Sequence, residues 1–411
     1  MGNVESCPPS RVVETNYGKV VGRRLIQDPE KPVDAFQGIP FAKPPLGELR
    51  FKVARGVVVV TMEYRLGFLG FFSTGDSASP GNYGLWDQLE ALKYVQENIG
   101  YFGGNKLNVT VFGQSAGGAS ADLLSLSPHA KGLMHKVIPM AGNACAQWAC
   151  RTEATIEKGK ELIKSLGLEE VNKFVLMNKL RELPAEKFLV PLDLEKDDVE
   201  LGNLLVDFGC HNSTYRIDLT PVIDGDFFPE PLEVLRSKAP AMPRMTGVTR
   251  LENSLFMMRH RFGADHLKDE LNKAIPSVMS DFVEMYKEEA EKHRENKNWR
   301  AAVELQSDLS FNNCTMKMVQ ECLQGGATVY TYIMDHCNPR AFGFLRFFAH
   351  STGQCTLFSL TEVYSQSEST HVMELPFLFD KGIIFDFAFD DDDKTIKDHF
   401  ATAFVNFARY G

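Results

Sequence analysis

The run from residue 107 to residue 126 constrains the fold of this 411-residue chain more than any other part of it. Residues 107–112 (LNVTVF) are a short stretch rich in β-branched side chains, which predicts a strand. Residues 113–118 (GQSAGG) follow at once, and residues 119–126 are apolar and suited to a helix. A strand, a Gly-x-Ser-x-Gly turn and a helix in succession predict an α/β fold that presents a serine at the end of a strand.

Ser115, at the centre of this turn, is the strongest candidate for a catalytic nucleophile. We expect small residues at Gly113 and Gly117 because a sharp strand-to-helix turn brings backbone close, so that a Cβ there would clash. The turn pushes the hydroxyl of Ser115 toward a substrate. The helix begins at the same point, and we therefore expect the amide of Ala116 to donate a hydrogen bond to a developing oxyanion.

A serine nucleophile needs a base, and the chain has ten histidines. His371 lies far downstream of the serine, in a polar stretch before the apolar residues 375–379, which suits a loop histidine that reaches into a site. His336, His350 and His399 remain alternatives on position alone. The pair His371 and Glu374 does not predict a metal site, because the second histidine and the third ligand of helical zinc motifs are missing.

The acid that orients the base is expected between the serine and the histidine along the chain. Glu252, Asp224 and Asp226 all satisfy this order, and spacing alone does not choose among them. Each of the three also fits a loop carboxylate that accepts hydrogen bonds from nearby backbone amides.

The remaining periodic segments predict one α/β domain without an internal repeat or a linker. Residues 57–64 (VVVVTMEY) predict a strand buried on both faces of a mostly parallel sheet, and residues 87–98 predict an amphipathic helix. Together with residues 107–112 they predict a strand-helix-strand crossover. Further segments predict a hairpin about Gly18 (residues 12–24), helices (residues 152–166, 267–291 and 299–323) and a strand (residues 327–334).

Composition limits the partners and the compartment of the chain. Its net charge of -10 argues against a nucleic-acid partner, which a basic face would recognise. No apolar run approaches the roughly 18 residues that cross a bilayer, and the first residues lack the basic start and apolar core of a secretory signal. The eight scattered cysteines predict reduced thiols. We therefore expect a cytoplasmic protein without a metal or an organic cofactor.

The first residues also match the Met-Gly-x-x-x-Ser pattern for myristoylation of Gly2, and Cys7 is available for a second, palmitoyl anchor. Such a pair of anchors would give peripheral membrane association. The alternative is an ordinary unanchored tail over residues 1–11.

Several motifs in one order carry a family resemblance: QGIPFAKPP (37–45), YRLG (64–67), NYGLWDQ (82–88), FGGN (102–105) and FGQSAGG (112–118). The chain resembles the type-B carboxylesterases and cholinesterases of the α/β-hydrolase fold, and the set is most similar to that of nematode carboxylesterases. The resemblance implies a mostly parallel central sheet flanked by helices over residues 12–411.

By this resemblance, Ser115 is the nucleophile, Glu252 is the acid of a Gly-x-x-x-x-Glu motif, and His371 is the base of a His-x-x-Glu motif. The resemblance thus favours Glu252 over Asp224. It implies a serine hydrolase that cleaves small-molecule carboxylic esters through an acyl-enzyme.

Two departures from the family imply an incomplete fold. The family carries a long segment between the positions of residues 53 and 56, with sheet strands and a His-Gly-Gly-Gly stretch, whereas no His-Gly-Gly occurs in this chain. Without this segment, the amide of Ala116 is the remaining oxyanion donor. Losing one such donor lowers kcat by about 10²–10³-fold. The family also continues beyond the position of residue 411. A catalytically impaired relative with a binding role is therefore the alternative function.

Three other features have two interpretations each. Trp86 lies near the site by resemblance and would pack on a substrate or in the core. Residues 342–348 would line an acyl pocket or pack under a lid. Residues 390–394 (DDDDK) resemble a protease tag site, but they are expected to be a solvated acidic loop. The sequence indicates neither the ester nor an oligomeric state.

Overall fold

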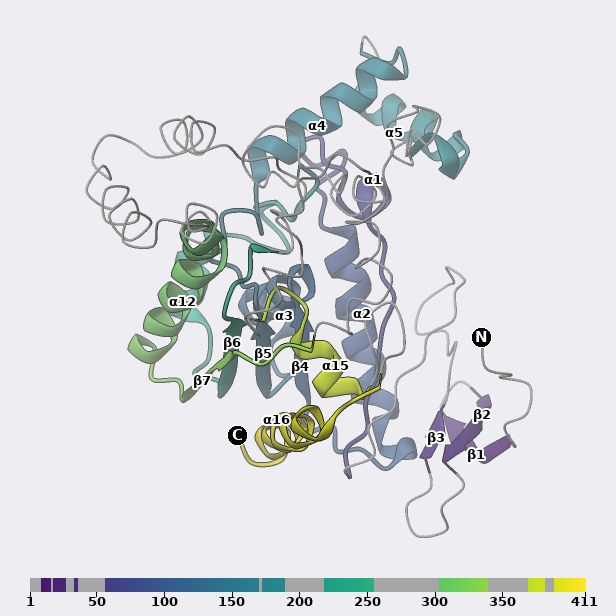
Figure 1. Cartoon of the computed structure of the whole chain (residues 1–411). Coiled ribbons are helices and arrows are strands. Elements are labelled where there is room, and N and C mark those ends of the chain that lie inside the picture. Colours follow the sequence, from purple (N-terminus) through teal and green to yellow (C-terminus); the bar gives the residue numbers. More distant parts are fainter. Residues whose placement is uncertain are drawn as a thin grey trace, which may run out of the picture.

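The computed structural model of the chain describes residues 9–15, 18–26, 33–35, 56–169, 172–188, 218–254, 303–338, 369–380 and 388–411. The predicted helix at 267–291, the alternative base His350, the segment 342–348, and Gly2 and Cys7 lie outside the described residues. The described strands form two sheets, one of three strands and one of four. Figure 1 shows the smaller sheet near one end of helix α2, apart from the larger one.

The larger sheet consists of β4 (Thr110–Gln114), β5 (Lys136–Met140), β6 (Arg244–Thr249) and β7 (Val329–Met334) in that order, all parallel. The smaller sheet consists of β1 (Pro9–Thr15), β2 (Gly18–Ile26) and β3 (Val33–Ala35), all antiparallel. The α-helices are α1 (Gly67–Phe71), α2 (Tyr83–Asn98), α3 (Ala116–Leu126), α4 (Thr152–Ser165), α5 (Lys173–Glu182), α7 (Leu232–Lys238), α12 (Asn313–Gln324), α15 (Glu374–Phe379) and α16 (Asp391–Tyr410). Short helices are η2 (Ile99–Phe102), η3 (Pro128–Ala130), η4 (Ala185–Phe188) and η6 (Asp308–Asn312).

Helices cover both faces of the larger sheet. On β5, Val137 packs into the core formed with α2 and α3, whereas the next residue, Ile138, packs into the core formed with α15 and α16. Successive side chains of a strand point to opposite faces, so both faces of this apolar strand must be buried. Figure 1 shows α15 and α16, in yellow-green and yellow, over the face opposite to α3. The predicted mostly parallel sheet flanked by helices is confirmed.

A buried charge cluster ties α3 to the sheet. Asp122 of α3 is completely buried and accepts hydrogen bonds from Arg236 of α7, at 2.7 and 2.5 Å, and from Arg244 of β6, at 2.6 Å. The amide of Ala144 donates a further bond of 2.9 Å. Burial alone would raise the pKa of Asp122, but the two guanidinium groups outweigh it and hold that pKa well below its usual range.

The predicted amphipathic helix and hairpin are confirmed. Helix α2 begins four residues before the predicted start and buries Leu85, Leu89 and Leu92 on one face. Strands β1 and β2 pair with Thr15 opposite Gly18, whose φ of 123° is a conformation that glycine adopts far more readily than other residues. The strand β3 was not predicted. The predicted helices at 152–166 and 299–323 and the strand at 327–334 correspond to α4, to the helical residues 303–324 and to β7.

The strand predicted at residues 57–64 is wrong. These residues are irregular, and the side chains of Val58 and Val60 are 42% and 48% exposed rather than buried on two faces. β-branched residues favour a strand only where neighbours complete the ladder and cover the side chains, and no described strand pairs with this segment. The predicted crossover is replaced by the unit β4-α3-β5, in which α3 connects two parallel strands.

None of the described helices is both long and apolar enough to span a bilayer. The described cysteines are all unpaired thiols, in agreement with the expectation from the sequence: Cys145, Cys150, Cys314, Cys322 and Cys337.

Candidate active site

Ser115 occupies the single residue between the end of β4 and the start of α3. Its φ of 58° and ψ of -122° are unusual for a residue with a side chain, and such a conformation costs on the order of 1–3 kcal/mol. Two hydrogen bonds hold it: the Ser115 amide donates to the carbonyl of Met140 (2.8 Å), and the Ser115 carbonyl accepts from the amide of Ala119 (2.9 Å). The turn leaves the Ser115 side chain only half-buried.

Close backbone contacts require glycine at Gly113, as predicted, and at Gly118 rather than at Gly117. A Cβ on Gly113 would collide with the backbone of Gly117, as expected. A Cβ on Gly117 would meet open space, so the predicted requirement there is wrong. The close contact falls on the next residue: a Cβ on Gly118 would lie 2.7 Å from the carbonyl oxygen of Gly142 and 2.8 Å from that of Met140. Gly118 thus allows the helix to approach the end of β5.

Ala116 is the first residue of α3 and is exposed. The amides of the first helical turn have no acceptor within the helix. The Ala116 amide therefore has no acceptor within the helix and lies directly after Ser115 in the chain.

Glu252 and His371 form a buried pair at the ends of two different segments. Glu252 follows β6 by three residues and is completely buried, and His371 precedes α15 and is 2% exposed. Oε2 of Glu252 lies 2.5 Å from Nδ1 of His371, and Oε1 accepts the amide of Thr249 at 2.5 Å. The backbones are joined as well, because the amide of Leu251 donates to the carbonyl of Ser369 (2.8 Å).

This pair determines which nitrogen of the histidine can act as a base. A carboxylate oxygen accepts at this contact, so Nδ1 is the nitrogen of His371 that donates to Glu252, and Nε2 is the ring nitrogen turned away from that carboxylate. The amide nitrogen of Gln114, the residue directly before Ser115, lies 3.3 Å from each of the two ring nitrogens of His371. The imidazole also packs on Phe311, with ring centroids 4.9 Å apart. The ring is thus held beside the end of β4.

The other candidate acids are engaged elsewhere. Oδ1 of Asp224 accepts the amides of Asp226 (3.2 Å) and Phe228 (2.9 Å), which is the loop role that the sequence left open. The carboxylate of Asp226 lies 3.0 Å from Nε2 of His129.

The other candidate bases are also placed away from this pair. Nε2 of His336 lies 2.7 Å from Oδ1 of Asp393, the N-cap-box residue of α16, and His399 is an exposed residue of the same helix. Asp393 is buried, so the acidic run at 390–393 is not wholly the solvated loop that the sequence predicted. It caps a helix instead.

Glu374 was not predicted as a functional residue, yet it lies in the same buried region. It is the first residue of α15 and is completely buried. Burial, and then the charge of Glu252, raise its pKa to about 8. The same two effects raise the pKa of the buried Tyr332 of β7 well above its usual value, through burial first and then the charges of Glu374 and Glu252. The His-x-x-Glu spacing is the one sequence signal at this position, and in the sequence it indicates the base His371 but no role for Glu374.

Comparisons with known proteins identify the family of the chain. A family model described as "Carboxylesterase family" matches residues 9–55 and 53–411. The chain belongs to the carboxylesterase family. Membership implies the α/β-hydrolase fold, with which the helix-flanked parallel sheet agrees. The two matched stretches meet at residues 53–55, beside the position where the sequence analysis places the missing family segment.

The curated relatives of the chain include nematode esterases and mammalian neuroligins. The chain is 32% identical to Esterase cest-33 of Caenorhabditis elegans over 87% of its own length and 61% of that protein. It is 33% identical to Gut esterase 1 of Caenorhabditis briggsae, over 70% of this chain and 53% of that one. It is 36% identical to human Neuroligin-2 over 44% of this chain and 19% of that one. The chain thus spans less than two thirds of these relatives.

Trp86 packs in the core of this carboxylesterase-family domain. Its ring lies 4.8 Å from that of His129 and 4.9 Å from that of Phe227, measured between centroids. Phe227 is completely buried in the core shared by α2 and α3. The core role left open by the sequence therefore accounts for this side chain.

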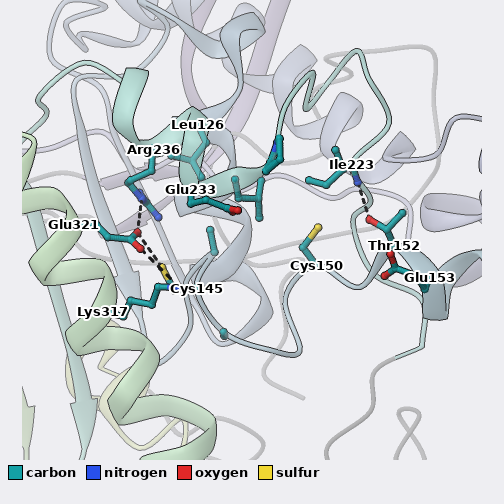
Figure 2. A pocket seen from close by; sticks show the side chains of 14 residues that line it. Leu126, Cys145, Cys150, Thr152, Glu153, Ile223, Glu233, Arg236, Lys317 and Glu321 are labelled. Carbon is teal, nitrogen blue, oxygen red and sulfur yellow. Dashed lines mark hydrogen bonds and ion pairs between the residues drawn. The ribbon is translucent and has the colours of Figure 1, made fainter.

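A cavity of about 540 Å³ lies away from Ser115, Glu252 and His371, none of which lines it. Figure 2 shows Glu321 of α12 between Arg236 of α7 and Cys145, whose thiol donates to Glu321 at 3.3 Å. Burial raises the pKa of Cys145 to about 12, so the thiol stays protonated and is a poor nucleophile. Among the described residues, no group of three or more His, Cys, Asp or Glu side chains could hold a metal ion.

Proposed function

We propose that this chain is a serine carboxylic-ester hydrolase that works through an acyl-enzyme. Ser115 is the nucleophile, His371 the base, and Glu252 the acid that orients it. The observation that carries the proposal is the 2.5 Å contact between Nδ1 of His371 and Oε2 of Glu252, because it leaves Nε2 unprotonated at the end of the strand that leads into Ser115. Esterase-named relatives support the same class of reaction.

The chemistry follows from these positions. Nε2 of His371 accepts the proton of the Ser115 hydroxyl while Oγ forms a bond to the carbonyl carbon of an ester. The tetrahedral intermediate collapses as the carbon–oxygen bond to the alcohol breaks, and His371 returns the proton to the departing alkoxide. Water, deprotonated by the same nitrogen, then attacks the acyl carbon. The bond between this carbon and Oγ of Ser115 breaks, His371 returns the proton to Oγ, and the acid is released. Glu252 stabilises the imidazolium that forms in each step.

Stabilisation of the oxyanion limits the rate that this mechanism can reach. The Ala116 amide is the donor that the sequence and the turn geometry supply, and each missing donor costs about 10²–10³ in kcat. We therefore expect Ser115 to react with an activated probe faster than the chain turns over an ordinary small-molecule ester. The competing proposal is a catalytically impaired member of the family, which the absence of a His-Gly-Gly stretch from the sequence favours.

Covalent labelling separates the two proposals. The purified full-length chain is treated with a fluorophosphonate, beside Ser115→Ala and Ser237→Ala, which removes an exposed hydroxyl of α7. Circular dichroism checks that all three are folded. Labelling of the unaltered chain and of Ser237→Ala, but not of Ser115→Ala, supports the hydrolase. Folded chains that do not label contradict it and favour the impaired relative. Turnover of p-nitrophenyl esters of increasing acyl length then measures whether deacylation follows.

A further inference from the structure

Two carboxyl groups, those of Glu252 and Glu374, are completely buried in one region beside His371. Their surroundings differ sharply. Glu252 accepts hydrogen bonds from the Thr249 amide and from the imidazole. Neither side-chain oxygen of Glu374 has a hydrogen-bond partner among the described residues. The amide of Gln114 approaches Glu374 and offsets part of the rise in its pKa, without forming a well-aligned hydrogen bond.

Two neighbouring carboxylates in a buried site do not both ionise at neutral pH, because each charge raises the cost of the other. The charge settles on the group that receives more hydrogen bonds from donors. Here that group is Glu252. The other carboxyl keeps its proton, since neither of its oxygens has a hydrogen-bond partner among the described residues and a poorly compensated buried anion is far more costly than a buried neutral acid.

The groups that face Glu374 do not supply a compensating positive charge. Among the described residues they are Glu252 from the loop after β6, Tyr332 from β7 and Gln114 from β4. His371 contacts Glu252 and Gln114. Among the described residues, no lysine or arginine forms an ion pair with either glutamate. The hydroxyl of Tyr332 is buried and has no hydrogen-bond partner among the described residues either.

We propose that Glu374 remains a neutral carboxylic acid in the working protein, so that this buried acid pair carries one negative charge, on Glu252, and that Glu374 is thereby a positioning residue for the base His371. The positioning role of Glu374 rests on the proposed esterase function, whereas the protonation of Glu374 does not. Loss of the Glu374 proton would place two charges together in the protein interior. One of the two carboxylates would then have to move toward water. If that group is Glu252, the hydrogen bond that it accepts from Nδ1 of His371 would be broken.

The protonation is tested first by infrared spectroscopy, which does not depend on activity. Spectra of the unaltered full-length chain are compared with those of Glu374→Gln and of Glu233→Gln, which removes an exposed carboxylate on α7. At neutral pH we expect the carbonyl band of a protonated carboxylic acid in the unaltered chain and in Glu233→Gln, and its loss in Glu374→Gln. The band should disappear as the pH rises through about 8. This titration needs only the unaltered chain if Glu374→Gln does not fold.

The positioning role is tested by the pH profile of fluorophosphonate labelling at Ser115. Glutamine resembles the neutral acid, so Glu374→Gln should label at a rate close to that of the unaltered chain at neutral pH. The unaltered chain should lose rate as the pH rises through the ionisation of Glu374, whereas Glu374→Gln should not.

The outcomes distinguish this proposal from the proposed function. Absence of the band from the unaltered chain, or its persistence in Glu374→Gln, would overturn the protonation. The same alkaline fall in both chains would overturn the positioning role. A band that titrates as expected in a chain that never labels would overturn the esterase function and leave the neutral Glu374 standing.

Discussion

Nδ1 of His371 lies 2.5 Å from Oε2 of Glu252, while the other oxygen of this glutamate is held by the amide of Thr249. The carboxylate is thus fixed at both oxygens, and one of them fixes the orientation of the imidazole. A buried charge held in this way keeps the proton on Nδ1 and stabilises an imidazolium when one forms.

Glu252→Gln should therefore lower the rate of Ser115 labelling by about 10⁴-fold, because an amide in place of the carboxylate favours the wrong tautomer and no longer stabilises the imidazolium. The pseudo-first-order rate with a fluorophosphonate measures this. Asp224→Asn is the matched control, since its carboxylate accepts amides of its own turn. Equal losses in the two variants would mean that Glu252 has no special role.

A pair of alanine substitutions tests the geometry of the turn. Gly118→Ala places a Cβ against the carbonyl oxygens of Gly142 and Met140 and should cost about 1–3 kcal/mol, as overpacking does elsewhere. It should also reduce labelling, because α3 must shift relative to Ser115. Gly117→Ala meets open space and should change both quantities little. Urea denaturation and labelling are the measurements, and an equal response of the two variants would contradict the contacts described.

Asp122→Asn should lower the free energy of unfolding by about 3–5 kcal/mol, because Arg236 and Arg244 lose a buried counter-ion. Asp226→Asn, with a side chain 69% exposed, is the control and should be nearly neutral. The pKa of Asp122 is depressed in the folded state, so its contribution is present above the unfolded pKa and is lost as the pH falls below about 4. Denaturation at a series of acidic pH values should show a smaller slope in Asp122→Asn.

Glu374 should make the chain less stable as the pH rises, whereas Asp122 makes it less stable as the pH falls. Its folded-state pKa, about 8, is raised above the ordinary value of 4.5, so the folded chain binds the proton more tightly than the unfolded chain does. The stability of the unaltered chain is then lost as the pH rises between these two values. Glu374→Gln lacks this ionisation, and its stability relative to the unaltered chain should increase with pH across that window. Denaturant titrations from acidic to mildly alkaline pH measure the difference, and a constant difference would show that Glu374 is ionised in the folded chain.

The parts of the fold that local pattern determines were predictable from the sequence. The strand-turn-helix about Ser115 and the amphipathic face of α2 depend on neighbours along the chain, and the structure confirms both elements. Residues 57–64 have the same local signal as a buried strand, but a strand also needs a partner, and partners are set by the whole sheet. The position of β3 and the crowding at Gly118 likewise depend on long-range contacts.

In the candidate site, too, only the features that depend on local sequence were predictable. The motif around Ser115 identified a nucleophile candidate, whereas spacing left Glu252, Asp224 and Asp226 open, because the pairing of an acid with a histidine is a contact between distant segments. The protonation of Glu374 is further from sequence still. It depends on the fact that neither oxygen of this buried side chain has a hydrogen-bond partner among the described residues, and on a second charge nearby. Sequence spacing predicts neither of these features.

Strand β4 pairs with β5 on one side, and no described strand pairs with it on the other. The segment that carries Ser115 therefore relies on one ladder and on the hydrogen bond from Ser115 to Met140 for its position. On heating, the amides along β4 should exchange with deuterium before those of β5, and the turn should lose its shape while the rest of the sheet is intact. Labelling at Ser115 should therefore be lost before the domain melts, because β4 has a described partner strand on one side only.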